Sequence, residues 1–207
     1  MALVLAVDVS DSIDSDEYRL QVQGIATALR SHEVQQAIMA QPHHRSAIAL
    51  LLWADAWSRQ ESSGWHIIDS PASAEAFAAL VAAFPRRTNG STGIGEGVGQ
   101  AVRLIESLRL TALRKVIDVS GDGIETPRLP QDKVMMLPEA RQLAERAGIV
   151  INGLALASEV PDLDEWYREN VILGPDAFVV KVKDAHDFTK AFGQKLLREL
   201  EVRVASR

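Results

Sequence analysis

Short, continuous runs of apolar residues alternate along this chain with longer segments in which apolar residues recur every three or four positions. The continuous runs are typical of strands buried on both faces, and they lie at residues 3–7, 46–53, 64–69, 115–119, 149–155 and 177–181. The periodic segments predict helices over residues 14–29, 70–84, 94–108, 138–147 and 188–200, with a further short helix beginning at residues 162–165. Predicted strands and helices therefore alternate along the chain.

Six strands interleaved with helices predict an α/β fold: a doubly wound, Rossmann-like, mostly parallel six-stranded sheet with helices on both faces. Polar residues 58–63 join the second and third strands, which suits a hairpin and makes the third strand the one antiparallel edge strand. Neither an internal repeat nor a low-complexity linker divides the chain. We therefore expect a single domain over residues 1–207.

Local signals define several helix ends. Asp14 and Glu17 form a capping box for the first helix, and Ser70 followed by Pro71 is a favourable helix start. The pair of acidic residues at 162 and 165 predicts a similar cap for the short helix, and Gly148 predicts the end of the helix before it.

Composition narrows the classes of function. With 28 acidic and 22 basic residues, the formal net charge is −6, which argues against binding to nucleic-acid phosphates. The chain has no cysteine, so disulfides, thiolate zinc sites and thiol nucleophiles are excluded. No apolar run reaches the roughly 18–20 residues of a membrane span, so we expect no membrane insertion. No leader precedes the first strand, and we expect that an exported precursor has been trimmed.

Three polar segments with a shared chemistry lie at predicted strand ends or helix starts, where a doubly wound sheet places function. Residues 8–12 follow the first strand, residues 88–95 precede a helix, and residues 120–123 follow the fourth strand. Together they supply two aspartates, several hydroxyl groups and flexible glycines. Such hard oxygen ligands suit Mg²⁺ or Mn²⁺, and the lack of cysteine and of clustered histidine argues against zinc.

Each segment alone also has a purely structural interpretation. Ser12 is equally consistent with a helix cap, the glycines at 93, 95 and 97 with a turn and close helix packing, and Asp122-Gly123 with a common turn. The three segments converge on one edge of the predicted sheet, and this convergence favours a binding site.

The pattern Asp8-x-Ser10-x-Ser12, followed by Thr92-Gly-Ile-Gly and then Asp122-Gly, resembles the metal-ion-dependent adhesion site of von Willebrand factor type A domains. The order of strands and helices fits that family over nearly the whole chain. Residues 3–10, 119–123, 151–154 and 166–170 resemble, more narrowly, a functionally uncharacterised bacterial branch of type A-like proteins. Asp11 departs from the pattern, because relatives often carry glycine there.

The resemblance implies a site for one Mg²⁺ or Mn²⁺ ion and a function in binding without catalysis. Ser10, Ser12 and Thr92 would contact the metal directly, whereas Asp8 and Asp122 would act mainly through hydrogen bonds or bound water. Neutral hydroxyl ligands leave much of the cation's charge uncompensated, so an Asp or Glu carboxylate of a protein partner can fill an open position. The branch usually carries an export signal, which implies a periplasmic or extracellular location.

Two alternatives remain open from the sequence. Asp8, Asp122 and a metal ion can in principle orient a phosphoester for hydrolysis, although no general base or nucleophile is placed beside the motif. The chain can also be a scaffold whose metal site is vestigial.

Weaker signals surround the motif. The loop at 124–137 carries partner specificity or is an ordinary variable connection. Trp53 and Trp57 indicate packing more than an interaction anchor, and Arg86-Arg87 indicates a solvated basic face.

Overall fold

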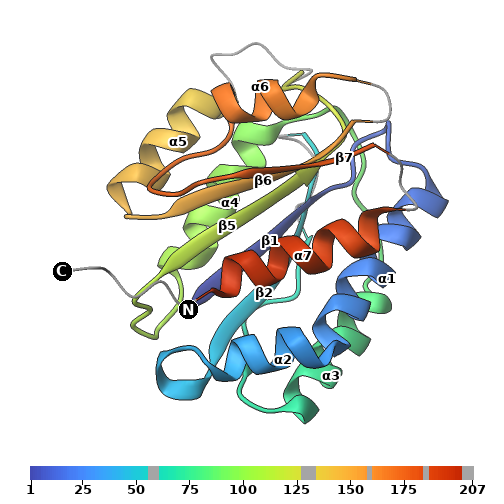
Figure 1. Cartoon of the computed structure of the whole chain (residues 1–207). Coiled ribbons are helices and arrows are strands. Elements are labelled where there is room, and N and C mark those ends of the chain that lie inside the picture. Colours follow the sequence, from blue (N-terminus) through green and yellow to red (C-terminus); the bar gives the residue numbers. More distant parts are fainter. Residues whose placement is uncertain (56–60, 127–133, 158–159, 184–186, 202–207) are drawn as a thin grey trace.

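The computed structural model describes residues 1–55, 61–126, 134–157, 160–183 and 187–201. In this part of the chain one seven-stranded sheet has the order β3-β2-β1-β5-β6-β7, with β4 also paired to β2 (Figure 1). The strands are β1 (Ala2–Asp8), β2 (Ser46–Trp53), β3 (Glu61–Ser62), β4 (His66–Ile68), β5 (Lys115–Gly121), β6 (Val150–Leu156) and β7 (Val179–Val182). Strands β2, β1, β5, β6 and β7 are parallel to their neighbours, and β3 and β4 run antiparallel to β2.

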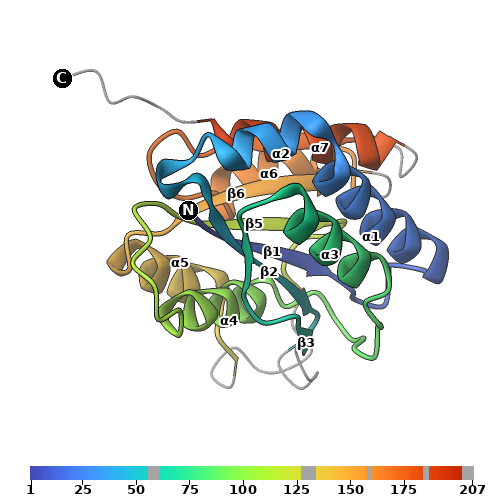
Figure 2. The same ribbon diagram turned by 90° about the horizontal axis from the view of Figure 1, so that it is seen from below.

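Helices cover both faces of the sheet (Figures 1 and 2). They are α1 (Ser15–Arg30), α2 (His32–Met39), α3 (Pro71–Ala82), α4 (Ile94–Glu106), α5 (Leu137–Arg146), α6 (Leu163–Asn170) and α7 (Phe188–Leu200), with a short 3₁₀ helix at Pro42–His44. Helices α1, α2, α3 and α7 enclose one apolar core, and α4, α5 and α6 enclose the other. Among the described residues, none of the helices has the length and apolar character needed to cross a membrane.

The predicted fold class is confirmed, with two local differences. The antiparallel edge consists of two short strands, β3 and β4, with Gly64 between them at a positive φ of 69°. Helix α2 was not predicted, because the apolar period breaks at Ser31, whose side chain accepts a hydrogen bond from the Val34 N–H and so starts a second helix.

The predicted helix ends are mostly correct. Asp14 and Glu17 form the capping box of α1, and Ser70 caps α3. Gly148 follows α5 with φ 64°, the conformation that suits glycine after a helix. Helix α6 starts at the predicted place, with Asp162 as its N-cap residue, but the Asp162 side chain makes no hydrogen bond to the first turn.

The order of the strands defines where function is expected. Strand β1 lies between β2 and β5, so the chain winds outward in one direction through β2 and then in the other through β5, β6 and β7. The winding direction therefore changes at the carboxyl ends of β1 and β5. In open α/β sheets, the crevice outside the strands at such a point is the usual ligand site.

A buried ion network joins α7 to the sheet. Lys195 Nζ lies 2.5 Å from Asp118 Oδ1 on β5 and 2.9 Å from Glu199 Oε1, one turn further along α7. All three side chains are buried, and the Asn152 amide on β6 donates to both Glu199 oxygens. Buried charges cost free energy unless they are paired, so this network fixes the position of α7 on the sheet.

Replacing the buried cation at the centre of this network should strongly destabilise the protein. Lys195→Met leaves Asp118 buried without its counter-charge and leaves Glu199 with only Arg114, 4.0 Å away, so we expect the free energy of unfolding to fall by about 3–5 kcal/mol. Urea unfolding at neutral pH measures the change, with the exposed Lys190→Met on the same helix as the control. Equal stability of the two variants would contradict a role for the network in holding α7.

Candidate metal centre

Two of the three polar segments meet at the switch point between β1 and β5. Asp8 is the last residue of β1, and its Oδ1 accepts a hydrogen bond of 2.8 Å from the Ser10 N–H. The hydroxyl oxygens of Ser10 and Ser12 lie 3.1 Å apart, and Ser12 donates to Asp122 Oδ1 over 3.0 Å. The structure therefore places four of the five predicted ligands in one connected cluster, although Asp122 is 110 residues from Ser12.

The fifth predicted ligand lies beside this cluster. Thr92 directly precedes the amino end of α4, and its carbonyl accepts a hydrogen bond from the Thr126 N–H at 2.8 Å. A methyl group placed on Gly123 would lie 3.5 Å from the Thr92 hydroxyl oxygen. The Thr92 hydroxyl is therefore adjacent to the residue that follows Asp122. Thr92 is buried, whereas Ser12 is exposed, so the cluster opens to solvent at Ser12.

The Asp8 carboxylate of the cluster lies in an environment that disfavours its charged form. Burial, reinforced by the charge of Asp122, raises the pKa of Asp8 from 3.8 to about 7. The second carboxylate oxygen of Asp8, Oδ2, is buried and has no hydrogen-bond partner among the described residues. A buried carboxylate oxygen without a donor is costly, and a cation or a further donor removes that cost.

The donor set fits a hard divalent cation. Three hydroxyl groups and two carboxylates converge, and in the described part of the chain no group of three or more His, Cys, Asp and Glu side chains is placed to hold a metal. A metal site here would therefore take part of its ligands from hydroxyl groups, and not from histidine or from further carboxylates. The residues that would hold such a cation are Asp8, Ser10, Ser12, Thr92 and Asp122.

Arg86 fixes the loop that carries the two serines. Its guanidinium donates to the carbonyl oxygens of Val9, Ser10 and Ile13 over 3.2, 3.1 and 2.6 Å. The sequence suggested a solvated basic face for Arg86-Arg87, and for Arg86 that interpretation is wrong, because its partners are backbone carbonyls that leave no sequence signal. Arg86 therefore holds residues 9–13 in the conformation that presents Ser10 and Ser12.

Asp11 ties this loop to the segment that carries Thr92. Its Oδ1 accepts a hydrogen bond of 3.0 Å from the Gly90 N–H, and its own N–H donates to the Gly90 carbonyl over 2.7 Å. Gly90 has a φ of 139°, and a methyl group there would approach Asp55 Oδ2 to 2.5 Å. Glycine at position 90 thus allows the serine loop and the loop before Thr92 to approach each other closely. Asp11, where relatives often carry glycine, connects the two loops through these hydrogen bonds.

Glu125 begins the loop at 124–137 and anchors it to two helices. Its carboxylate accepts hydrogen bonds from the Gly95 N–H at the start of α4 and from the Leu137 N–H at the start of α5. Burial raises the pKa of Glu125. Residues 127–133 of this loop, and Trp57, lie outside the described residues, whereas Trp53 is buried in the core as expected.

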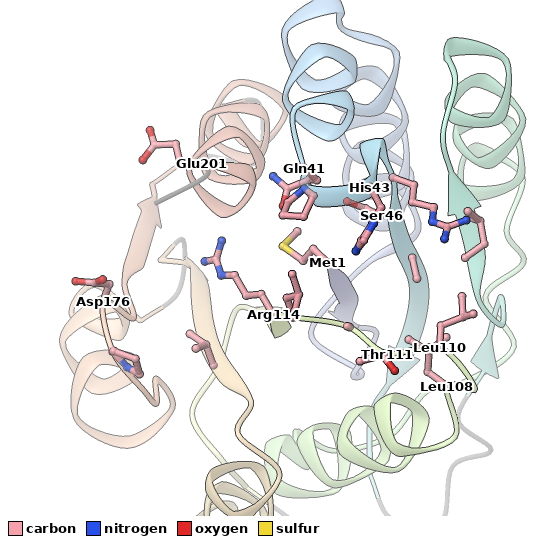
Figure 3. Close-up of a pocket in the computed structure, with 18 residues that line it drawn as sticks. Met1, Gln41, His43, Ser46, Leu108, Leu110, Thr111, Arg114, Asp176 and Glu201 are labelled. Atoms are coloured by element: carbon pink, nitrogen blue, oxygen red, sulfur yellow. The ribbon is translucent and has the colours of Figure 1, made fainter. Parts of the chain in front are cut away.

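A cavity of about 600 Å³ lies at the opposite end of the sheet (Figure 3). Met1, Ser46, Leu110 and Arg114 are among its lining residues, and they flank the amino ends of β1, β2 and β5. None of the five predicted ligands lines this cavity. It is therefore separate from the candidate metal centre.

The fold is that of a von Willebrand factor type A domain. A pilus adhesin, SpaC of Lactobacillus rhamnosus GG in an open conformation, is similar with a TM-score of 0.68 and 15% identity, over 97% of this chain and 30% of SpaC. Proximal thread matrix protein 1 from the mussel byssus, with a zinc-occupied adhesion-site motif, has a TM-score of 0.67 and 14% identity, over 96% of this chain and 47% of that protein. The VWA domain of SpRpn10 has a TM-score of 0.59 and 12% identity, over 90% of this chain and 92% of that domain.

The family is shown by its sequence model. The chain belongs to the family described as "Protein of unknown function (DUF1194)", whose model matches residues 1–204. A search of curated protein sequences finds no significant match. The chain spans less than half the length of the adhesin and of the byssus protein.

The raised pKa of Asp8 predicts a pH dependence in metal-free protein. Between about pH 4 and pH 7 the native state keeps a proton on Asp8 that the unfolded state has released, so the Asp8 contribution to stability falls as pH rises. The total is roughly 4 kcal/mol. Urea unfolding in chelator should therefore show Asp8→Asn gaining stability relative to wild type across this range, with no further gain above it. A difference that does not change with pH would contradict this assignment.

Arg86→Gln should loosen the serine loop. The variant loses hydrogen bonds from a charged donor to three carbonyls, and we expect a loss of about 2 kcal/mol in unfolding free energy. The neighbouring Arg87→Gln is the matched control, because no side-chain hydrogen bond holds Arg87 to this loop among the described residues. Equal unfolding free energies of the two variants would show that Arg86 does not support the loop.

Proposed function

We propose that this chain is a divalent-cation-dependent protein-binding module. In this proposal residues 1–207 form a single domain that holds one Mg²⁺ or Mn²⁺ ion. Ser10, Ser12 and Thr92 are the direct ligands, and Asp8 and Asp122 act through hydrogen bonds or bound water. The observation that carries the proposal is the hydroxyl chain from Ser10 through Ser12 to Asp122, beside the buried and partly unpartnered carboxylate of Asp8.

The partner is a protein that offers an Asp or Glu carboxylate. Neutral hydroxyl ligands leave a bound dication with net positive charge, which is what an incoming carboxylate needs. The exposed Ser12 places that charge at the surface. The similarity to a pilus adhesin and to a byssus protein with a zinc-occupied adhesion site supports binding rather than catalysis. The choice of Mg²⁺ or Mn²⁺ over zinc rests on the oxygen-only donor set.

The same similarities support an extracellular or periplasmic location. SpaC is a pilus adhesin, and a minor pilin of Streptococcus sanguinis is also similar, with a TM-score of 0.63. At such a location, cation-dependent binding to another protein would serve attachment.

Metal binding is the first test. Titration calorimetry of Mg²⁺ and Mn²⁺ into chelator-stripped protein should give saturable one-site binding that Asp8→Ala abolishes and Ser12→Ala weakens. Asp16→Ala, which removes an exposed carboxylate on α1, is the matched control and should bind like wild type. Wild-type protein that binds neither ion would contradict the proposal.

The partner chemistry is tested by selecting displayed peptides on the immobilised protein with Mg²⁺ present. Enriched peptides should contain Asp or Glu, should dissociate on chelation, and should lose binding when that residue becomes Asn or Gln. Binding that survives both chelation and the combined Ser10→Ala and Asp122→Ala substitutions would favour a scaffold instead. Metal-dependent hydrolysis of p-nitrophenyl phosphate that Asp8→Ala removes would favour the hydrolase alternative.

A further inference from the structure

Tyr167 is a buried polar residue beneath the candidate metal centre. It lies on α6, which covers the same face of the sheet as α4 and α5 (Figure 1). Its side chain has no solvent exposure, and among the described residues its hydroxyl has no hydrogen-bond partner. A buried hydroxyl without a partner costs free energy, so it needs a structural or functional reason.

Two glycines make room for the Tyr167 ring on the sheet. A methyl group on Gly153 of β6 would come within 2.8 Å of Tyr167 Cδ1, and one on Gly121 of β5 would come within 2.7 Å of the Tyr167 hydroxyl. Gly153 pairs with Val119, two residues before Gly121. The ring therefore crosses β6 at one glycine, and its hydroxyl reaches over β5 at the other.

The hydroxyl reaches toward Asp8. The same methyl position on Gly121 would lie 2.8 Å from Asp8 Oδ2, so both oxygens lie within 2.8 Å of one point. Asp8 Oδ1 already accepts the Ser10 N–H, and Oδ2 is the oxygen without a donor. A donor and an acceptor, each buried and each without a described partner, thus face the same small space.

Helix α6 is held in place by charges at its amino end. Asp164 lies 2.6 Å from Arg168 on the same helix and 2.7 Å from Lys181 on β7. Leu163 and Tyr167 are buried one turn apart on the side facing the sheet. The direction of the Tyr167 side chain is therefore fixed by the fold and not by an interaction of its own hydroxyl.

We propose that the Tyr167 hydroxyl is the hydrogen-bond donor to Asp8 Oδ2 through one bridging water molecule, and that it positions this carboxylate behind the metal ligands. The effect of this hydrogen bond on metal binding rests on the proposed function, because Asp8 belongs to the proposed metal site. Tyr167 is a positioning residue, since it reaches the metal only through Asp8. Burial, together with the charges of Asp8 and Asp122, holds the pKa of Tyr167 well above its usual range, so the phenol keeps the proton it donates.

The first test compares two conservative variants. Tyr167→Phe removes only the hydroxyl, and we expect the Mg²⁺ dissociation constant from titration calorimetry to rise about tenfold, as for other residues that orient metal ligands. Tyr18→Phe is the matched control, because Tyr18 donates to the Phe84 carbonyl on the other face of the sheet. Its Mg²⁺ affinity should stay within about twofold of wild type. Wild-type affinity in Tyr167→Phe would overturn the proposal.

The second test observes the hydrogen bond without metal. The chain has two tyrosines, so protein labelled with ¹³C at tyrosine Cζ gives two NMR signals, and Tyr18→Phe assigns the one from Tyr167. Asp8→Asn weakens the acceptor and should shift the Tyr167 signal, whereas Asp16→Asn should not. An unmoved Tyr167 signal would overturn the proposal even if affinity fell, because only a structural effect would then remain. If wild-type protein bound no Mg²⁺, the proposed function would fail, and this measurement would still decide the hydrogen bond.

Discussion

The burial of one carboxylate at the end of the central strand constrains the whole functional edge of this protein. Asp8 has no solvent exposure, and burial raises its pKa to about 7. An isolated buried carboxylate is unfavourable, so the surroundings must supply donors or positive charge. One oxygen accepts a hydrogen bond from the Ser10 N–H, and the other lies near the Tyr167 hydroxyl. The positive charge of Arg86 lowers the pKa of Asp8, but its effect is smaller than that of burial.

Hydrogen bonds join the loops of this edge to one another and to the helices behind them. Arg86 binds the carbonyls of the serine loop, Asp11 joins that loop to Gly90, and Glu125 connects the amino ends of α4 and α5. Each link is a hydrogen bond between a side chain and the backbone of a different segment. The backbone segments that carry the serine and threonine hydroxyls are therefore held in place by their neighbours. Such preorganisation lowers the cost of binding a ligand.

The strands and most helices could be predicted because their signals are local. Continuous apolar runs mark β1 and β5, and Asp14 with Glu17 marks the start of α1. The five candidate ligands were predicted from polar segments at two strand ends and before one helix, together with the family resemblance, and their role as ligands stays a prediction. Arg86 and Tyr167 were not assigned their contacts, because their neighbours are backbone carbonyls or a carboxylate 159 positions away in the chain. Such pairings depend on strand order, which local patterns do not specify.

Two aspartates of the sheet, Asp118 and Asp8, are both buried, but their surroundings differ. Asp118 on β5 faces α7 and lies against Lys195, so the rise of its pKa to about 6, which burial causes, is opposed by the positive charge of Lys195. Asp8 on β1 faces α6, which presents a phenol at that point and not a cation. A carboxylate that served only stability would gain most from a partner like Lys195. Asp8 has no such contact among the described ion pairs, and it lies at the open edge where the winding reverses, so a divalent cation bound there would supply the positive charge.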